Sequence, residues 1–365
     1  MSPHHNVRRP RHARREPDSV YPPILLRLGL MHNSYLYTGV DVSADWLDAA
    51  RQHADSAPEH RRFANTAHGH AALRQWLTEA GQSVRVVTEA SGVYGIDLAL
   101  TLHGADSIEV MVLNPRAAKD YRRAHMHRSK TDAIDAAALC DYGRRMPFVA
   151  WEPPEVDAVE LRQCARRIAD LTVERARERN RLHAAQASRT TSAVVTNDIE
   201  VNLRHLDRRI DEMVRQALKL IAESTRLASA YEHLTSVKGI AAKSAVLLLG
   251  ELLCLPAGMS VREWVAYAGL DVRQHRSGRS VEARPRISKE GNVHIRRALY
   301  MPALVAVRFE PAVGAFYEGL VERGKPKMVA VVAVMRKLLH AIYGMLKHDA
   351  DFDGSKCFQA APARA

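Results

Sequence analysis

Four acidic residues are spaced in a way that could assemble a metal site. Asp41 and Glu89 each follow a short run rich in β-branched and aromatic residues, LYTGV and VRVVT, which predicts a buried strand. Asp132 and Asp135 open an alanine-rich helical stretch, and residues three apart lie on nearly the same face of a helix. Carboxylate oxygens suit Mg²⁺, and two such ions can assist the breaking of a phosphodiester. The pattern therefore indicates nucleic-acid strand chemistry.

Each carboxylate also has an ordinary structural explanation when it is taken alone. An Asp at the end of a strand is common, and Asp132 stands near a helix start, where the helix dipole favours a negative charge. The combination of acids after the first and fourth strands with a helical pair matches the ribonuclease-H-like nuclease arrangement. In that fold the first and fourth strands are neighbours, so we expect all four acids to meet.

The segment HRSGRS holds a second candidate for chemistry. Ser277 and Ser280 are expected in a polar turn, and Ser288 is expected to cap or turn into the helix that follows. A serine hydroxyl among arginines could attack phosphorus while guanidinium groups balance the charge, although most Ser-Gly pairs only mark turns. The arginines around this turn are Arg273, Arg276, Arg279, Arg284 and Arg286.

The overall composition narrows the class of protein. The chain has 365 residues, enough for two domains, and a net charge of +12. Such a charge is typical of nucleic-acid binders, because Lys and Arg release counterions from phosphates, but it also fits a ribosomal or membrane-surface protein. The four cysteines form no Cys-x-x-Cys pair, which predicts neither a zinc site nor a disulfide framework and favours a reducing cytoplasm. The longest strongly apolar run, 328–335, is far short of the roughly 20 residues of a membrane span.

The chain divides into segments of different pattern. Residues 1–34 are rich in Arg, His and Pro and are expected to form a disordered basic tail, with Met31 as an alternative start. Residues 35–150 alternate strands and helices, which predicts an α/β domain with a mixed sheet. The expected strands are 36–42, 46–51, 61–64, 84–89 and 108–113, and the expected helices are 69–80, 94–104, 115–125 and 132–145.

The remainder of the chain is predicted to be mainly helical. Residues 156–228 carry a 4-3-4-3 apolar spacing from Ile199 to Leu220, which predicts a helical hairpin or a dimerising coiled coil. Residues 232–350 follow as a mainly α C-terminal domain, and its LTSVKGIAAKSA segment resembles a helix-hairpin-helix, whose turn offers backbone N–H groups to a DNA phosphate. Expected nucleic-acid contacts are Arg166, Arg167, Arg175, Lys238, Gly239, Arg273, Arg276, Arg279, Arg284, Arg286 and Lys289.

Taken in order, several motifs resemble the insertion sequence 110 family of transposases, the bridge-RNA-guided recombinases related to the Piv DNA invertase. The motifs are GVDVSADWLD, FANTAHGHAALRQWL, TEASGVYG, VLNPRAAKDY, KTDAIDAAALCDYGR, SVKGIAAKSA, AYAGLDVRQHRSGRSV and ISKEGNVHIRRALYMPALVA. The resemblance extends over residues 35–350 and preserves the order and spacing of the motifs.

The resemblance implies an N-terminal RuvC-like domain, a coiled-coil segment and a C-terminal transposase domain with a catalytic serine. Asp41, Glu89, Asp132 and Asp135 match the family's DEDD tetrad, which is catalytic and binds Mg²⁺, and Ser277 matches the serine that links covalently to DNA. It further implies double-stranded donor and target DNA, a structured non-coding guide RNA, and a homo-oligomer, dimer or tetramer, whose protomers could share active sites. A bacterial, nucleoid-associated cytoplasmic protein is expected.

The expected function is therefore a site-specific DNA recombinase that acts through a 5′-phosphoserine intermediate with Mg²⁺-assisted chemistry. The alternative is a RuvC-like, structure-selective endonuclease, in which the tetrad alone hydrolyses DNA by a two-metal mechanism. A third hypothesis, a non-catalytic nucleic-acid-binding protein that keeps the fold, is disfavoured by the intact tetrad.

Overall fold

The computed structural model describes residues 35–358, apart from 54–55, 91, 126–130 and 278–280. Residues in this range form two compact units, one ending at Ala150 and the other beginning at Trp151. The predicted basic tail, residues 1–34, lies outside the described residues. The two units are described in turn below.

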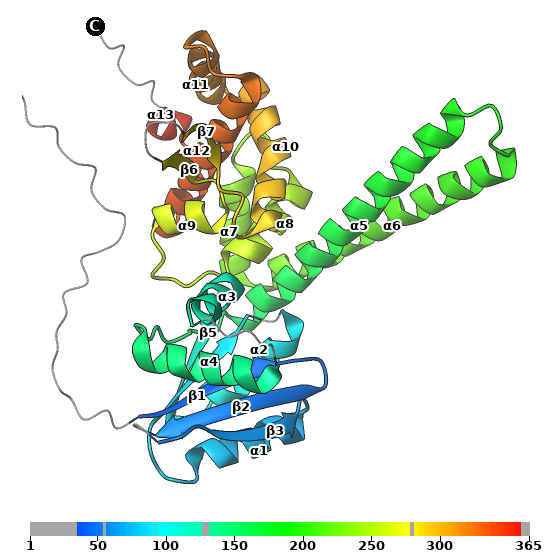
Figure 1. The fold of residues 1–365 in the computed structure, drawn as a ribbon. Coiled ribbons are helices and arrows are strands. Elements are labelled where there is room, and N and C mark those ends of the chain that lie inside the picture. Colours follow the sequence, from blue (N-terminus) through cyan, green and yellow to red (C-terminus); the bar gives the residue numbers. More distant parts are fainter. Residues whose placement is uncertain (1–34, 54–55, 91, 126–130, 278–280, 359–365) are drawn as a thin grey trace, which may run out of the picture. The chain divides into compact units, whose positions relative to one another are not determined.

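A five-stranded mixed sheet forms the centre of the first unit (Figure 1). The strand order is β3-β2-β1-β4-β5; β1 pairs antiparallel with β2 and parallel with β4. The strands are β1 (Leu36–Val42), β2 (Trp46–His53), β3 (Glu59–Ala64), β4 (Val84–Glu89) and β5 (Ile108–Leu113). Val40, Val84, Val86 and Val87 are fully buried, because the central strands are covered on both faces. The mixed sheet and its five strands confirm the predicted α/β fold.

Four helices cover this sheet. They are α1 (Ala67–Thr78), α2 (Val93–His103), α3 (Pro115–Ala124) and α4 (Asp132–Arg145). Three begin at a polar cap whose side chain accepts a backbone N–H: Thr66 for α1, Asn114 for α3 and Thr131 for α4. Helices α1 and α2 lie against each other, whereas α4 crosses β1, β2 and β4 on the other face of the sheet (Figure 1).

A long helical hairpin opens the second unit. Helices α5 (Val156–Ala187) and α6 (Ala193–Glu223) lie side by side and are joined by a short turn (Figure 1). The 4-3-4-3 seam of α6 is buried within the same chain, because Leu206, Ile210 and Ala217 share one core with α5 residues. Of the two predicted arrangements, the intramolecular helical hairpin therefore explains the apolar seam.

The rest of the second unit is a helical bundle that also contains a small β-hairpin. Its elements are α7 (Thr225–Thr235), α8 (Ala242–Leu252), α9 (Val261–Tyr267), β6 (Val272–Ser277), β7 (Val281–Ile287), α10 (Val293–Phe309), α11 (Pro311–Glu322), α12 (Lys327–His348) and α13 (Gly354–Cys357). One hydrophobic core joins these helices to the base of α5 and α6. The antiparallel strands β6 and β7 were not predicted, because their arginine-rich sequence lacks an apolar alternation.

Helix α12 is the centre of this bundle. By length and apolar composition, α12 alone could cross a membrane. Helices α10 and α11 together are also long and apolar enough, but the chain bends by 96° between them. Half of the most apolar stretch of α12 is buried inside the protein, with Val334, Leu338 and Ile342 fully enclosed. This is the pattern of a core helix, which explains why the sequence around 328–335 is so apolar.

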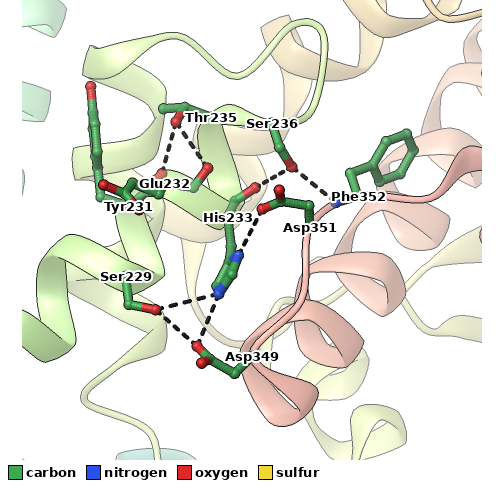
Figure 2. Close-up of polar contacts among 9 residues, drawn as sticks. All are labelled: Ser229, Tyr231, Glu232, His233, Thr235, Ser236, Asp349, Asp351 and Phe352. Carbon is green, nitrogen blue, oxygen red and sulfur yellow. Dashed lines mark hydrogen bonds and ion pairs between the residues drawn. The ribbon is translucent and has the colours of Figure 1, made fainter.

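A polar cluster joins α7 to the chain just after α12 (Figure 2). The His233 ring nitrogens lie 2.8 Å from Asp351 Oδ1 and 2.9 Å from Asp349 Oδ1, and the Ser229 hydroxyl donates to the same Asp349 oxygen. Hydrogen bonds first to Asp351 and then to Asp349 raise the pKa of His233. The Ser236 hydroxyl also accepts the backbone N–H of Phe352 at 2.9 Å. These bonds fix the end of α12 to α7.

Candidate active site

Two of the predicted carboxylates stand at one edge of the sheet. Asp41 is the second-last residue of β1, and Glu89 is the last residue of β4. The parallel register pairs Val40 with Thr88, so the two acids follow at matching positions on neighbouring strands. The adjacency of the first and fourth strands, predicted from the sequence, is confirmed.

The other two predicted carboxylates come from the first turn of α4. Asp132 is its first residue and is exposed, whereas Asp135 is buried. Helix α4 packs on β1 and β4, the strands that carry Asp41 and Glu89, through close approaches at Gly39 and Gly143. The helix therefore brings its acidic turn to the edge of the sheet where those strands end.

The other three acids act on the carboxyl group of Asp41. Burial, followed by the charges of Asp135, Asp132 and Glu89, raises the pKa of Asp41 to about 6, and only Arg122 opposes this shift. A raised carboxyl pKa means that adding a further negative charge here is unfavourable. The cluster therefore has the charge surplus that a bound cation would relieve.

Two arginines already supply part of that positive charge. Arg122 Nη1 lies 2.6 Å from Asp135 Oδ2, and its Nη2 lies 3.9 Å from Glu89 Oε2. Arg62 Nη2 lies 3.6 Å from Asp132 Oδ2. Sequence reasoning missed both residues. The basic run RAAKDYRR before the acidic pair was the available signal for Arg122, whereas nothing in the sequence pointed to Arg62.

The donor set suits a hard divalent cation, because all four side chains offer carboxylate oxygens. In the described part of the chain, however, no three His, Cys, Asp or Glu side chains converge closely enough to hold a metal ion. Arg122 bridges two of the tetrad members at this point. The donor chemistry of the residues therefore fits the implied metal, and binding it would require the side chains to draw together.

A cavity of about 490 Å³ opens beside Glu89. Its lining is mostly basic and comes from α3, so it offers a strongly positive surface next to the carboxylates. The lining residues besides Glu89 are Pro115, Arg116, Lys119, Asp120, Arg122 and Arg123. Guanidinium and ammonium groups in such a place are suited to a DNA phosphate.

The predicted nucleophile belongs to the second unit. Ser277 is the last residue of β6 and pairs with Val281 of β7, while Arg279 and Ser280 lie outside the described residues. Ser288 is held in place: its hydroxyl donates to Asp271 Oδ1 and accepts the backbone N–H of Glu290 at 3.3 Å. Ser288 therefore stabilises a turn, and the following helix is capped by Asn292.

Several predicted nucleic-acid contacts form ion pairs within the chain. Arg166 donates from Nε and Nη2 to the buried carboxylate of Glu251, at 2.7 and 3.2 Å, which gives it a structural role. Arg175 pairs with Asp207 across the helical hairpin, and Arg273 Nη1 lies 2.8 Å from Glu290 Oε1. Arg286 and Lys289 are exposed, as is Arg273, and Arg276 and Arg284 lie in β6 and β7.

The predicted helix-hairpin-helix turn joins α7 to α8. Gly239 has a φ of 115°, and a Cβ there would lie 2.7 Å from the Pro302 carbonyl oxygen, so only glycine fits against α10. Lys238 remains 63% exposed, with its Nζ 3.8 Å from Glu310 Oε2. Arg167 is half-buried and lines a basic cavity on the α5–α6 hairpin.

Comparison with known families decides the relationship. A transposase model of the DEDD type of IS110 matches residues 38–188, and a model described as transposase IS116/IS110/IS902 family matches residues 231–318. Both units therefore carry the family's sequence pattern. The chain belongs to the IS110 family of transposases.

Relatives of this transposase include DNA-inverting proteins. It is 28% identical over 326 residues to the pilin gene-inverting proteins of Moraxella bovis and Moraxella lacunata, covering 88% of this chain and 98% of each relative. It is also 26% identical over 117 residues, 31% of this chain and 28% of the relative, to the insertion element IS110 uncharacterized 43.6 kDa protein of Streptomyces coelicolor. The transposase is accordingly a DNA-recombining enzyme, and its DEDD class implies use of a divalent metal.

Proposed function

We propose that this transposase cuts and rejoins DNA strands with its carboxylate tetrad and with Ser277 as nucleophile. The single observation that carries the proposal is the position of the acids. Two acids lie at the ends of neighbouring parallel strands, and two open the helix packed on those strands. Burial, followed by the charges of the other three acids, raises the pKa of Asp41 to about 6. A group of acids with a raised carboxyl pKa at the end of a sheet is typical of a functional site.

The tetrad would hold the divalent ions. Asp41, Glu89, Asp132 and Asp135 supply the oxygen donors, and Mg²⁺ bound there would polarise the scissile phosphate and stabilise the leaving oxygen. Arg122 and its neighbours on α3 would orient the phosphate backbone beside Glu89. The tetrad and Ser277 belong to different units, so both units would have to be engaged by the same DNA.

Ser277 would carry the covalent step. Its Oγ attacks phosphorus and the hydroxyl proton is lost, so that an Oγ–P bond forms while the P–O3′ bond breaks and the departing oxygen is protonated to a 3′-hydroxyl. The result is a 5′-phosphoserine. Attack by the 3′-hydroxyl of another strand then restores a phosphodiester and returns the proton to Ser277. Arginines on both sides of the β6–β7 turn would balance the phosphorane charge.

The proposed partners are DNA, RNA and further copies of the chain, and they are inferred from the net charge and from the family. The DNA would be double-stranded donor and target, read by base pairing with a structured non-coding RNA while the protein holds the backbone. A homo-oligomer in the bacterial cytoplasm, associated with the nucleoid, would complete the assembly. The net charge of +12 supports phosphate binding, as does a cavity of about 520 Å³ on the α5–α6 hairpin. Its basic residues are Arg167, His205, Arg208, Arg209 and Arg215.

A denaturing gel of protein on labelled DNA tests this function. The unmutated protein should form a covalent adduct with Mg²⁺ and none in excess EDTA, and Ser277→Ala should abolish the adduct while DNA and RNA binding persist. Ser280→Ala is the matched control and should retain the adduct. Strand cleavage without any adduct in the unmutated protein would instead support the alternative, a RuvC-like endonuclease that hydrolyses DNA.

A further inference from the structure

An arginine occupies the position between two tetrad carboxylates of the first unit. Arg122 extends from α3, and its two terminal nitrogens lie 2.6 Å from Asp135 Oδ2 and 3.9 Å from Glu89 Oε2. The side chains of Arg122 and Asp135 are only 22% and 6% exposed, so the pair is largely shielded from water. Breaking a shielded pair is unfavourable unless each charge finds a new partner.

The partners that Arg122 holds are also the groups that divalent ions need. Asp135 and Glu89 are proposed ligands, and a guanidinium at ion-pair distance repels a divalent cation bound to the same carboxylates. In keeping with this, no three acidic, histidine or cysteine side chains of the described residues converge on a metal position. The cation and Arg122 therefore compete for the same negative charge.

A new partner for Arg122 is available in the cavity beside Glu89. Arg122 lines that cavity together with Arg116, Lys119 and Arg123, all on α3. A DNA phosphate in the cavity would be within reach of the displaced guanidinium, since one side chain already contacts both the cavity and the tetrad. Arginine suits this exchange, because its planar fork binds carboxylate and phosphate oxygens alike.

We infer that Arg122 is a positioning residue that changes partners during the reaction. It neutralises Asp135 and Glu89 while the tetrad holds no metal, and it pairs with a phosphate of the bound strand once metal ions occupy the tetrad. The inference rests on the proposed metal-dependent function. It predicts that the tetrad binds metal weakly until DNA is present, which would limit cleavage to the assembled complex.

Mn²⁺ affinity without DNA tests the first half of this exchange. Full-length protein is titrated with Mn²⁺, and the free ion is counted by electron paramagnetic resonance, for the unmutated protein, Arg122→Gln and Arg123→Gln. Both variants lose one positive charge from the same helix. We expect Arg122→Gln to bind Mn²⁺ several-fold more tightly, and Arg123→Gln to change much less. Thermal unfolding checks that each variant is folded, and Arg122→Met replaces Arg122→Gln if the latter is not.

The results of the Mn²⁺ titration distinguish a failure of the partner exchange from a failure of the proposed metal-dependent function. Folded Arg122→Gln that binds Mn²⁺ no more tightly than the unmutated protein would overturn the exchange. An unmutated protein and variants that all fail to bind Mn²⁺ would overturn the metal-dependent function, and the exchange with it.

Salt dependence of DNA binding tests the second half. Each phosphate contact adds about one unit to the slope of log affinity against log salt concentration. With Ca²⁺ in the tetrad, Arg122→Gln should lower this slope by about one on a non-specific duplex, but it should leave the slope in EDTA unchanged, because Arg122 is then held by Asp135. Arg123→Gln should change the slope by the same amount with Ca²⁺ and in EDTA. An equal loss for Arg122→Gln with and without Ca²⁺ would contradict the exchange.

Discussion

Gly39 of β1 and Ala136 of α4 approach so closely that a Cβ on Gly39 would lie 2.1 Å from the Ala136 carbonyl oxygen. The same Cβ would lie 2.3 Å from the backbone nitrogen of Cys140, one turn further along α4. At the other end of the helix, a Cβ on Gly143 would lie 2.7 Å from Val87 Cγ2 of β4. These two contacts press α4 onto the strands that carry Asp41 and Glu89.

Gly39→Ala should therefore damage both stability and activity. The new methyl group meets backbone atoms that cannot rotate away, so α4 must move outward together with Asp132 and Asp135. We expect a loss of about 1–3 kcal/mol in the free energy of unfolding and a large loss of strand cleavage. Denaturant unfolding and cleavage of labelled DNA measure the two effects. Gly104→Ala, whose nearest neighbour would be an ordinary 3.6 Å contact, is the matched control; equal behaviour of the two variants would refute the role of Gly39.

Asp41→Asn should abolish cleavage yet stabilise the metal-free protein. Burial and the three neighbouring acids raise the pKa of Asp41 from 3.8 to about 6, so the folded state binds this proton more tightly than the unfolded state. The resulting penalty grows as the pH rises from 3.8 to about 6 and is complete above that range. In EDTA at pH 7.5 the variant should melt a few degrees higher than the unmutated protein.

Mn²⁺ supplies the control for Asp41→Asn. Mn²⁺ at a concentration well above its Kd for the DNA-free protein should raise the Tm of the unmutated protein and raise that of the variant much less, since a ligand stabilises only a state that binds it. A variant that melts lower than the unmutated protein in EDTA would show that Asp41 supports the fold rather than a cation.

The sequence alone was sufficient for the sheet and for the adjacency of the strands that carry Asp41 and Glu89. The strands β1, β4 and β5 are short runs rich in β-branched residues, and the parallel order of β1 and β4 places Asp41 and Glu89 at matching positions. Sequence reasoning could not assign the partners of these acids. Arg122 and Arg62 meet them through tertiary packing, and neither spacing nor composition specifies such long-range pairs.

The same limit applied in the second unit. From the sequence, the arginine-rich run that contains Arg166 and Arg175 is compatible both with a nucleic-acid-binding surface and with a set of intramolecular ion pairs. The structure decides for Arg166, because the buried Glu251 lies opposite it. The strands β6 and β7 were not predicted, because their many charged residues leave no alternation of apolar and polar residues. His233 gave no signal either, because its two aspartates lie more than a hundred positions away in the chain.

The His233 cluster predicts a pH-dependent stability. Bonds to Asp351 and Asp349 raise the pKa of His233 in the folded protein, so its contribution is complete below its ordinary value of about 6.5 and is lost as the pH rises through the folded pKa. The difference in Tm between the unmutated protein and His233→Gln should thus be largest at pH 6 and shrink towards pH 9. A difference that grows with pH would contradict the charged cluster of Figure 2.

The basic cavity on the hairpin predicts a nucleic-acid contact. Arg208 and Arg209 are exposed and line it, so Arg208→Gln with Arg209→Gln should weaken RNA binding several-fold and flatten its salt dependence. A filter-binding titration on RNA co-purified with the protein measures both effects. The pair Arg74→Gln and Arg262→Gln, exposed residues that do not line the cavity, removes the same charge and should have little effect. Equal weakening by both pairs would assign the binding to net charge alone.

The account depends most directly on the bond between Ser277 and DNA. Protein trapped on its DNA with Mg²⁺ can be digested with protease and nuclease, and the nucleotide-bearing peptide can be sequenced by mass spectrometry. We predict one modified peptide, with a 5′-phosphate ester on Ser277, which is absent in EDTA and in Asp135→Asn. A modification on Ser280 or Ser288, or cleaved DNA with no nucleotide-bearing peptide, would contradict the serine mechanism.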